Sequence, residues 1–528
     1  MKKIYLLFIV AISMLFATQA IAQRYVPIAA SGTADPTDIY PIIKGDTTAT
    51  GERVDNNTIY QLENGQVYVT SGRMVNTTDW PLQIEALDLE NKASKAILTR
   101  KPNDSGSYKD IMRAGGDVSL KNLWIISGEK GPLEQHDWGK IRIMTENSKV
   151  VIKDCIIEKD RGGFIQIRAN GIKAYLTNTI LRNGGNRRII QGNGRGFECR
   201  NYTMDTVIMK NCIVHNIQDR FFRSQGASEP HNYIEIDHCT SYNTAGRHGF
   251  IQLGRVVTAK ITNNLFINPI MLGTSPIYTN EQTQPDNDKH KVITLDTLYS
   301  NTSLTVANNN IFWTQDVMDY WATNDSVSTP DILSDLIIQN LGSNASDAYF
   351  QDTLTLSSVP GSILQYVKDL YANPAAEDMY DFIVEDIAVQ GTAFDSGNLF
   401  DFSTFNPCYP TSKMSATGGT DGSAVGATFL CADLMTANDN ISFGQLNFDI
   451  FPNPTSNELN FSFELNTPSN ITIYISGIDG RKIQLENANF STGVHSFSKN
   501  ITNNFAPGMY FLTIQSKNKI ESRKVIIH

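Results

Sequence analysis

The clearest pattern in the chain is a short run of β-forming residues that is interrupted by one polar residue. The interruptions fall at Asp154, Asn178, Asn211, His238 and Asn263, so successive copies are 24, 33, 27 and 25 residues apart. A repeat of this length that contains strands and no helices is typical of a β-solenoid. We therefore expect an all-β fold in which each copy contributes one coil. The copies occupy residues 120–123, 152–155, 176–179, 209–212, 236–239, 261–264 and 306–309.

The interrupting residues predict a tight corner, because Asn and Asp tolerate left-handed backbone geometry. The residue after each corner would then point into the solenoid. No CxxC motif or Cys/His cluster accompanies the cysteines at these positions, so we interpret them as small buried side chains and not as disulfides or metal ligands. This inward column reads Cys155, Thr179, Cys212, Cys239 and Asn264.

A second repeated strand occurs in residues 140–143, 164–168, 189–193, 221–225 and 250–253. Successive strand residues point to opposite faces, so we place the apolar residues Ile141, Ile165, Ile190, Phe222 and Ile251 inside. The outward column is then Arg142, Gln166, Gln191, Arg223 and Gln252. Its neighbours on the outer face are Phe164, Ile189, Phe221 and Phe250 on one side, and Arg168, Asn193 and Gln225 on the other.

The loops that enter these strands are basic, and equivalent positions of a parallel stack lie about 4.8 Å apart. The repeat therefore predicts a stripe of guanidinium, amide and aromatic groups. Guanidinium groups bind carboxylates through paired, charge-assisted hydrogen bonds. The stripe favours an acidic polysaccharide as ligand; the alternative is a polar face that only stabilises the solenoid. The loop residues are Arg161, Arg187, Arg188, Arg220, Arg247 and His248.

Composition and the N-terminus place the protein outside the cytoplasm. A net charge of -10 and a pI near 5.4 argue against a general nucleic-acid binder. Lys2 and Lys3 precede the apolar residues 4–16 and a small-x-small site at residues 20–22. We therefore expect residues 1–22 to be a signal peptide. No later segment is apolar enough to cross a membrane, and we expect a secreted monomer.

We expect the β-helix domain over residues 23–330 and its C-terminal cap and return segment over residues 331–440. The cap would cover the last coil, whose open edge could otherwise pair with other strands. Residues 329–331, Thr-Pro-Asp, predict a helix start. Cys408 and Cys431 lie close enough in sequence to pair. Residues 441–528 contain short strands and Asn/Gly turns, which are typical of a small Ig-like β-sandwich.

The last part of the chain contains four motifs in order. They are Phe-Pro-Asn-Pro-Thr at residues 451–455, Gly-Arg-Lys at 480–482, Pro-Gly-Met-Tyr at 507–510, and Lys524. In this order they resemble the type A C-terminal sorting domain of the type IX secretion system. The resemblance implies transit through the periplasm, export by the type IX machinery, and release or attachment at the outer-membrane surface.

Residues 50–430 resemble the pectate lyase-like superfamily of right-handed parallel β-helix proteins. The resemblance is carried by the corner residues, by residues 59–68, and by the closing stretches 408–410 and 421–427. The superfamily contains lyases, hydrolases, esterases and adhesins. Its lyases use an Arg or Lys base, often with calcium, which nominates Arg220, Arg223 or Arg247. The pKa expected of a general base favours His248 instead, because His248 is the one group of the stripe that titrates near neutral pH.

Calcium has little support in the sequence. Glu235 and Asp237 alternate on one strand and could supply two oxygen ligands. They precede the corner, however, and do not belong to the Arg/Gln strand. We therefore predict no metal ligands and leave the cofactor undecided.

Three functions fit these observations. A polysaccharide lyase would cleave a uronate-containing glycan by β-elimination, with Arg142, Arg223 and Arg247 neutralising the substrate carboxylate. A non-catalytic carbohydrate-binding protein or adhesin would use the same stripe only for retention. A glycoside hydrolase would need the loop aspartates Asp137, Asp160 and Asp219 to converge. The lyase is our main hypothesis.

Overall fold

The computed structural model divides into two compact units, Met1–Met435 and Thr436–His528, and each is described by itself. The structure describes the first unit at residues 23–32, 35–101, 110–126, 140–160, 162–185, 194–246, 248–274, 291–324, 327–372, 405–431 and 434. It describes the second unit at residues 448–451, 453, 455–456, 458–465, 469–477, 482–491, 493–501, 505–516 and 520–528.

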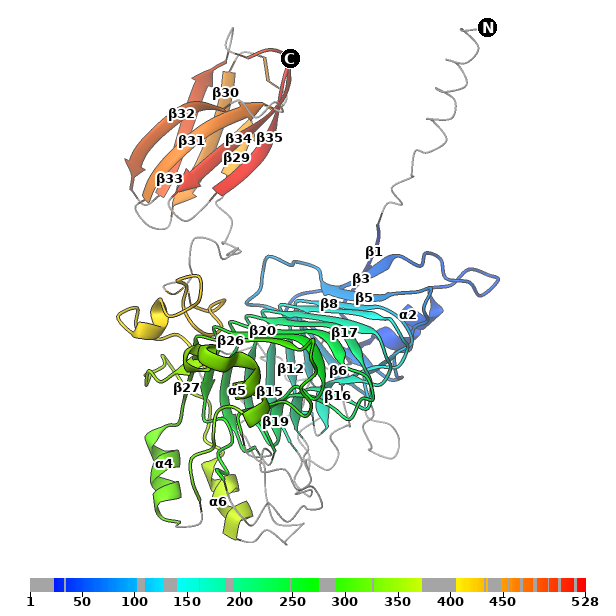
Figure 1. Ribbon diagram of the computed structural model, residues 1–528. Helices are drawn as coiled ribbons and strands as arrows, with labels where there is room; N and C mark the ends of the chain where they lie inside the picture. Colours follow the sequence, from blue (N-terminus) through cyan, green and yellow to red (C-terminus); the bar gives the residue numbers. More distant parts are fainter. Residues whose placement is uncertain are drawn as a thin grey trace, which may run out of the picture. The chain divides into compact units, whose positions relative to one another are not determined.

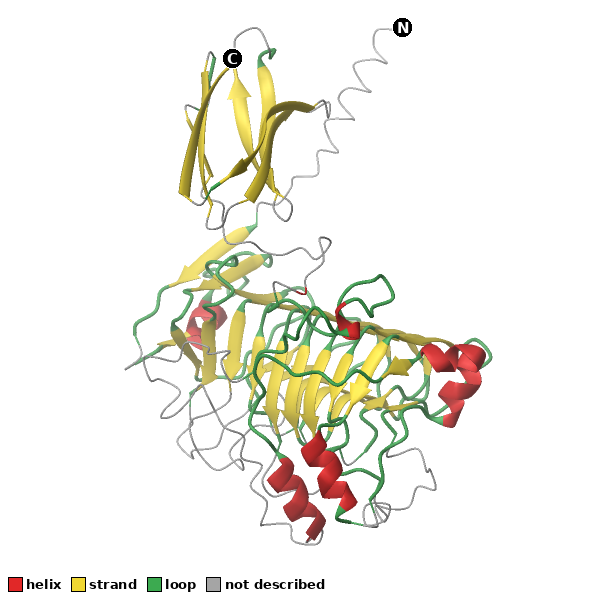
Figure 2. Ribbon diagram, turned by 90° about the vertical axis from the view of Figure 1, so that its left-hand side faces the viewer, coloured by secondary structure: helices red, strands yellow, loops and turns green. Residues whose placement is uncertain are grey.

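The first unit is a right-handed parallel β-helix, as predicted (Figure 1). Each regular coil contributes one strand to each of three parallel sheets, and the strands stack in chain order along the axis (Figure 2). The ten-stranded sheet contains β1 (Arg24–Ile28), β3 (Thr58–Leu62), β5 (Leu82–Ala86), β8 (Val118–Lys121), β11 (Lys149–Lys153), β14 (Ile172–Thr177), β17 (Met204–Lys210), β20 (His231–Asp237), β23 (Val256–Thr262) and β26 (Ser303–Ala307).

The other two sheets complete each coil. The eleven-stranded sheet contains β2 (Thr37–Asp38), β4 (Val67–Thr70), β6 (Ala96–Arg100), β9 (Leu123–Ile126), β12 (Ile156–Glu158), β15 (Ile180–Gly184), β18 (Ile213–Ile217), β21 (Thr240–Thr244), β24 (Leu265–Ile267), β27 (Asn309–Phe312) and β28 (Tyr349–Phe350). The seven-stranded sheet contains β7 (Met112–Ala114), β10 (Ile141–Ile143), β13 (Gly163–Ile167), β16 (Arg195–Arg200), β19 (Arg220–Gln225), β22 (Ile251–Gln252) and β25 (Ile293–Thr294).

The predicted corner joins the ten-stranded and eleven-stranded sheets. Asn122, Asp154, Asn178, Asn211, His238, Asn263 and Asn308 all have positive φ there, between 49° and 59°. Their side chains bond along the stack: Asn178 donates to Asp154 at 3.0 Å, and Asn211 donates to Asn178 at 2.7 Å. The column after the corner, which contains Cys155, Cys212 and Cys239, is fully buried as expected.

A second asparagine ladder was not predicted. Asn183, Asn216, Asn243 and Asn268 also have positive φ, between 51° and 59°. Asn243 donates to Asn216 at 3.1 Å, and Asn268 donates to Asn243 at 3.0 Å. This ladder follows the eleven-stranded sheet, so asparagines stabilise two of the three turns of a coil.

Short helices lie at the two ends of the β-helix. At the N-terminal end, α2 (Ile39–Gly45) buries Ile39 and Ile43 in the core. At the other end lie α4 (Gln315–Ala322), α5 (Asp335–Leu341) and the 3-10 helix η3 (Gly342–Asp347). The helix α6 (Leu364–Ala372) instead lies beside the coil of β18, where Gln218 donates to the Tyr366 hydroxyl at 2.5 Å. A further 3-10 helix, η5 (Met414–Ala416), lies in the return segment.

The helix expected from residue 330 begins instead at Asp335, after the N-cap Ser334. The residues between have a different role, because the Ile293 amide donates to the carbonyl of Ile332 at 2.8 Å. Leu333 pairs with Ile293 in a parallel bridge. These residues continue the seven-stranded sheet before the chain turns into α5, which contacts β26.

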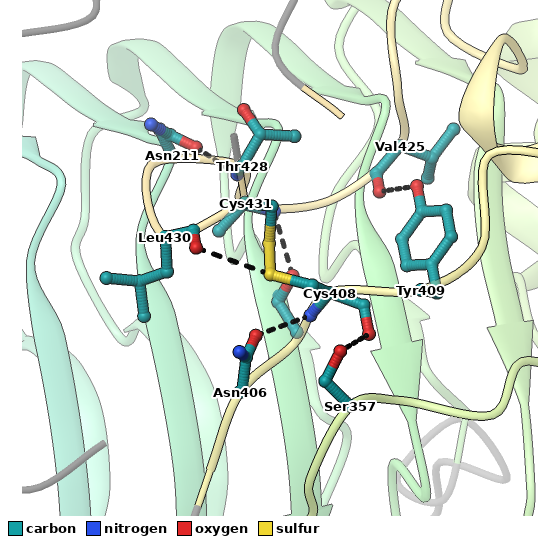
Figure 3. Close-up of a disulfide and its surroundings, with 11 residues drawn as sticks. Asn211, Ser357, Asn406, Cys408, Tyr409, Val425, Thr428, Leu430 and Cys431 are labelled. Carbon is teal, nitrogen blue, oxygen red and sulfur yellow. Dashed lines mark hydrogen bonds between the residues drawn. A yellow bond between two sulfur atoms is a disulfide. The ribbon is translucent and has the colours of Figure 1, made fainter. Parts of the chain in front are cut away.

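The return segment docks on the corner and is closed by a disulfide between Cys408 and Cys431 (Figure 3). Asn211 accepts a hydrogen bond from the Thr428 amide at 2.7 Å. Asn263 accepts one from the Thr420 amide, also at 2.7 Å. The corner residues therefore bind both their neighbours in the stack and the return segment.

The second unit is an antiparallel β-sandwich. One sheet contains β29 (Phe448–Phe451), β30 (Glu458–Leu465) and β33 (Gly493–Asn500). The other contains β32 (Lys482–Phe490), β31 (Ser469–Gly477), β34 (Gly508–Ser516) and β35 (Ile520–Ile527). Alternating residues such as Leu459, Phe461, Phe463, Ile471 and Ile473 form its core.

Candidate functional site

The outward column of the seven-stranded sheet is built largely as predicted, with one substitution. Strand pairing aligns Arg142 with Gln166, Gln166 with Glu198, and Glu198 with Arg223. Glu198 therefore occupies the position that we predicted for Gln191, because β16 supplies the strand that pairs with β13. The complete column is Arg113, Arg142, Gln166, Glu198, Arg223, Gln252 and Thr294.

Several predicted site residues cannot be placed. Arg188, Gln191, Asn193 and Arg247 lie outside the described residues, as do Arg161, Arg187, Ile189 and the aspartate Asp137.

The expected exposed aromatic column is wrong. Phe164, Phe221 and Phe250 are completely buried. All three side chains belong to the hydrophobic core of the β-helix. Phe221 packs against Phe250 and against Phe266 of the adjacent sheet, with ring centroids 5.4 and 5.7 Å apart. Phe221 is therefore a core residue and offers no face to a sugar.

Glu198 is a buried carboxylate surrounded by arginines. Its Oε1 lies 3.2 Å from Nη1 of Arg195 and 3.5 Å from Nη1 of Arg223, and its Oε2 lies 3.8 Å from Nη2 of Arg168. Burial alone would raise the pKa of this carboxyl, but the charges of Arg195, Arg168 and Arg223 lower it below its usual value. Oε2 accepts no hydrogen bond from any described residue. Glu198 is thus ionised, and its Oε2 is buried beside Arg168 without a hydrogen bond from a described residue.

Asp219 is a second buried carboxylate in the same cluster. Its Oδ2 accepts hydrogen bonds from Nε of Arg220 at 2.8 Å and Nε of Arg195 at 3.0 Å. Its Oδ1 lies 2.9 Å from Nδ1 of His248. Burial opposes ionisation, yet Arg220, His248 and Arg195 together hold the pKa of Asp219 well below its ordinary value. Asp219 therefore links two buried arginines to the histidine.

Counted over the described residues, the central cluster carries an excess of positive charge. It contains the guanidinium groups of Arg168, Arg195, Arg220 and Arg223 against the two carboxylates Glu198 and Asp219, so four positive charges face two negative ones. Burial and the repulsion of Arg220 and Arg195 lower the pKa of Arg223 to about 8. An anionic ligand would relieve this repulsion, which makes the cluster suited to a carboxylate.

The amides of the stripe each hold one guanidinium in place. Gln166 accepts from Nη2 of Arg168 at 3.2 Å, and Gln225 accepts from Nη2 of Arg223 at 3.2 Å. Gln252 accepts from Nη1 of Arg220. Among the described residues none of the three amide nitrogens donates a side-chain hydrogen bond. The amides thus use their oxygens within the protein and keep their N–H groups, which suits a ligand rich in acceptors.

His248 has the geometry of a general base. The Asp219 carboxylate accepts from Nδ1–H, which fixes the tautomer and leaves the Nε2 lone pair available. The side chain is 27% exposed, so part of the imidazole faces solvent. Burial, followed by the charges of Arg220 and Arg223, lowers the pKa of His248 to about 4. The imidazole is therefore neutral at pH 7.

The structure does not fit a calcium site at the stripe. Glu198 and Asp219 are both engaged by arginines, and the described residues contain no group of three His, Cys, Asp or Glu side chains that could hold a metal. Glu235 and Asp237 lie on β20 in the ten-stranded sheet, where Lys210 pairs with both. We therefore assign no metal a role here.

Glu198 and Arg195 are the functional candidates that the sequence reasoning missed. A signal was present: Gly-Phe-Glu-Cys at residues 196–199 has the same alternation as Phe-Ile-Gln-Ile at 164–167. Counting back from Phe222, which pairs with Phe197, would have placed Glu198 in the outward column. The apolar pair at residues 189–190 was chosen instead because it resembles the other strands more closely.

Comparison with known proteins identifies the second unit. Residues 449–528 match the family of the secretion system C-terminal sorting domain. No curated protein matches the chain. No helix in the described parts of the chain is long and apolar enough to cross a membrane. The chain therefore ends in a type IX secretion sorting domain, which directs it to the cell surface or the extracellular space.

Proposed function

We propose that the β-helix is a polysaccharide lyase that cleaves a uronate-containing glycan on the outer face of the seven-stranded sheet. The observation that carries this proposal is the Asp219–His248 pair, with its 2.9 Å hydrogen bond, beside a cluster that has two unbalanced positive charges. The cluster supplies a carboxylate clamp, and the histidine supplies a base that is neutral at physiological pH.

β-Elimination needs both groups at one sugar. Guanidinium groups bound to the uronate carboxylate acidify the neighbouring C–H bond. The Nε2 lone pair of His248 takes that proton, and the electron pair of the C–H bond forms a C=C bond as the C–O bond to the next sugar breaks. The imidazolium formed is stabilised by the buried Asp219 carboxylate, and its proton can return to the departing oxygen. Arg223, with its amide partner Gln225, is our candidate for the carboxylate clamp.

The carboxylates of the cluster favour elimination over hydrolysis. A glycoside hydrolase needs one carboxylic acid that keeps its proton near neutral pH. The arginines instead lower the pKa of both Glu198 and Asp219. Asp160, another aspartate considered for hydrolysis, accepts a hydrogen bond from the Gly162 amide at 2.6 Å. Neither Glu198 nor Asp219 therefore has the raised pKa of a proton donor.

The test is a screen of the mature chain against alginate, polygalacturonate and hyaluronan, with and without a chelator. Product formation is followed by the ultraviolet absorbance of the new C=C bond, and saturated reducing ends and glycan retention are measured in parallel. We expect the absorbance to rise on at least one polymer, and to rise equally in the chelator.

The other outcomes point to different functions. New reducing ends without the absorbance signal would show that the protein is a hydrolase and not a lyase. Retention of a polymer without any product would support a surface carbohydrate-binding protein or adhesin, for which the same arginine stripe suffices.

A further inference from the structure

A second group of arginines lies on the same outer face, three coils away from Glu198. Arg113 follows Arg142 in the outward column of the seven-stranded sheet. Arg73 lies one coil further toward the N-terminus, because the next residue, Met74, pairs with Met112. Both side chains converge on the buried carboxylate of Asp110, which is 6% exposed.

Asp110 does not neutralise this group. Arg113 donates to Oδ2 through Nε, and its Nη2 lies 3.5 Å from Oδ1. Arg73 reaches Oδ1 at 3.4 Å, and Nη1 of Arg142 lies 3.8 Å from Oδ2. Arg73 and Arg113 alone bring two positive charges to one negative charge. Among the described residues, a single carboxylate thus supports more than one guanidinium, and positive charge remains on this face.

Both arginines retain donors that can reach a ligand. The side chains of Arg73 and Arg113 are 30% and 36% exposed. A guanidinium has five N–H donors, and the hydrogen bonds of each to Asp110 use at most two of them. Like charges held side by side destabilise the fold unless a counter-charge joins them.

Arginines connect this group to the central cluster without a gap. Each strand of the sheet from β7 to β19 carries or is followed by an arginine. In strand order these are Arg113 on β7, Arg142 on β10, Arg168 directly after β13, Arg195 and Arg200 on β16, and Arg223 on β19. Arg113 and Arg223 are four strand spacings apart, about 19 Å at about 4.8 Å each. A single sugar cannot bridge this distance, whereas a chain of several charged sugars can.

We propose that Arg73 and Arg113, held by Asp110, form a distal anion subsite that binds a second negative charge of a polyanionic glycan lying along the stack. This inference rests on the proposed function in taking the ligand to be an acidic glycan. It adds that the site selects for chain length, because a short oligomer bound at the central cluster does not reach Asp110.

The test compares glycan lengths in the double variant Arg73→Gln/Arg113→Gln. Affinities of the full mature chain are measured for size-defined uronate oligomers, from disaccharide to decasaccharide, of the polymer that the wild type retains. In the wild type we expect affinity to rise with length. In the variant the ratio of long-oligomer to short-oligomer affinity falls about tenfold or more, the value of one or two charge-assisted hydrogen bonds.

The matched control is Lys153→Gln/Lys260→Gln, which removes two positive charges from β11 and β23 in the ten-stranded sheet. It should keep the wild-type ratio. The single variant Arg73→Gln, which removes only the 3.4 Å contact to Asp110, serves if the double variant does not fold. A purely structural role would lower all affinities together and leave the ratio unchanged, and that result would overturn the subsite.

The outcomes separate this inference from the lyase. If binding depends on length and this dependence is lost in the variant, while the wild type forms no elimination product, the subsite is supported and the lyase proposal is contradicted. Elimination product with an unchanged ratio in the variant supports the lyase and removes the subsite. A wild type that binds no uronate oligomer of any length overturns both.

Discussion

At the scale of single residues, the candidate site depends on two buried carboxylates that keep four arginines together. Asp219 is completely buried and contacts Arg195, Arg220 and His248. Removing one partner of such a group leaves an uncompensated buried charge, which costs more than the loss of an exposed ion pair. Site and stability are therefore coupled at this residue.

The variant Asp219→Asn should lower the free energy of unfolding of the β-helix by about 3–5 kcal/mol, because Arg220 loses its buried counter-charge. Urea unfolding of the mature chain measures this. Asp205→Asn is the control, since Asp205 pairs with the exposed Lys173 at 3.6 Å and should contribute no more than about 1 kcal/mol. Equal effects of the two substitutions would contradict the buried network.

Buried histidines predict how stability changes with pH. Burial lowers the pKa of His231 and of His248 to about 4, below the ordinary value of 6.5. Between these values the unfolded chain binds a proton that the folded chain does not, so stability falls as pH drops from about 6.5 to 4. The loss is at most about 1.4 kcal/mol per pH unit for each histidine. Unfolding curves at pH 7 and pH 5 measure it, and His231→Gln should reduce the difference.

The residue scale is also where sequence reasoning reached its limit. The positions of Arg142, Gln166, Arg223 and Gln252 follow from alternation and were predicted. The burial of Phe221 was not predicted, because alternation places it on the outer face whereas its side chain packs on Phe266 of a neighbouring sheet. Gln191 was chosen over Glu198 because two adjacent segments of one coil both alternate, and only the strand pairing decides between them.

At the scale of elements, one corner residue per coil holds the stack together. Asn178 combines a φ of 49° with hydrogen bonds to Asp154 and Asn211. Its backbone conformation is strained for most residues, and its side chain connects three consecutive coils. The sequence predicted this corner because the strained position admits few residue types. The second ladder, at Asn216 and Asn243, escaped notice because no cysteine column marks it.

Two substitutions at Asn178 separate conformation from hydrogen bonding. Asn178→Gly keeps the left-handed backbone and loses two side-chain hydrogen bonds, so it should cost about 2 kcal/mol. Asn178→Val loses the same bonds and adds strain, so it should cost about 2 kcal/mol more. Chemical denaturation of the mature chain gives both values. Should valine be tolerated as well as glycine, the positive φ would not be a constraint on the corner.

At the scale of the whole molecule, the chain combines a solenoid that carries the candidate site with a sandwich that carries the export signal. The fold class and the sorting domain were predictable, since a coil repeat and ordered motifs are properties of the sequence itself. The candidate catalytic residues were less predictable, because their pairing depends on which loop residues come into contact in the fold. Asp219 and His248 are 29 positions apart in the chain and form one pair only through the stacking of successive coils.

Deleting residues 449–528 should stop export while leaving the β-helix folded, because the sorting domain is a separate compact unit. In a host with a type IX secretion system, the truncated chain should accumulate in the cell and the full chain in the medium or on the surface. Fractionation followed by immunoblotting shows which occurs. Surface delivery of the truncated chain would place the export signal elsewhere.

The central claim is that His248, oriented by Asp219, is the base of an elimination reaction. The most direct test is the pH dependence of kcat/KM for unsaturated product, in the wild type and in His248→Asn. With a pKa of about 4, His248 should give a rate that is constant above about pH 5 and falls below pH 4, and the variant should lose about 100-fold or more. A variant that keeps the rate, or a profile that rises only near pH 8 where Arg223 would titrate, would contradict this assignment.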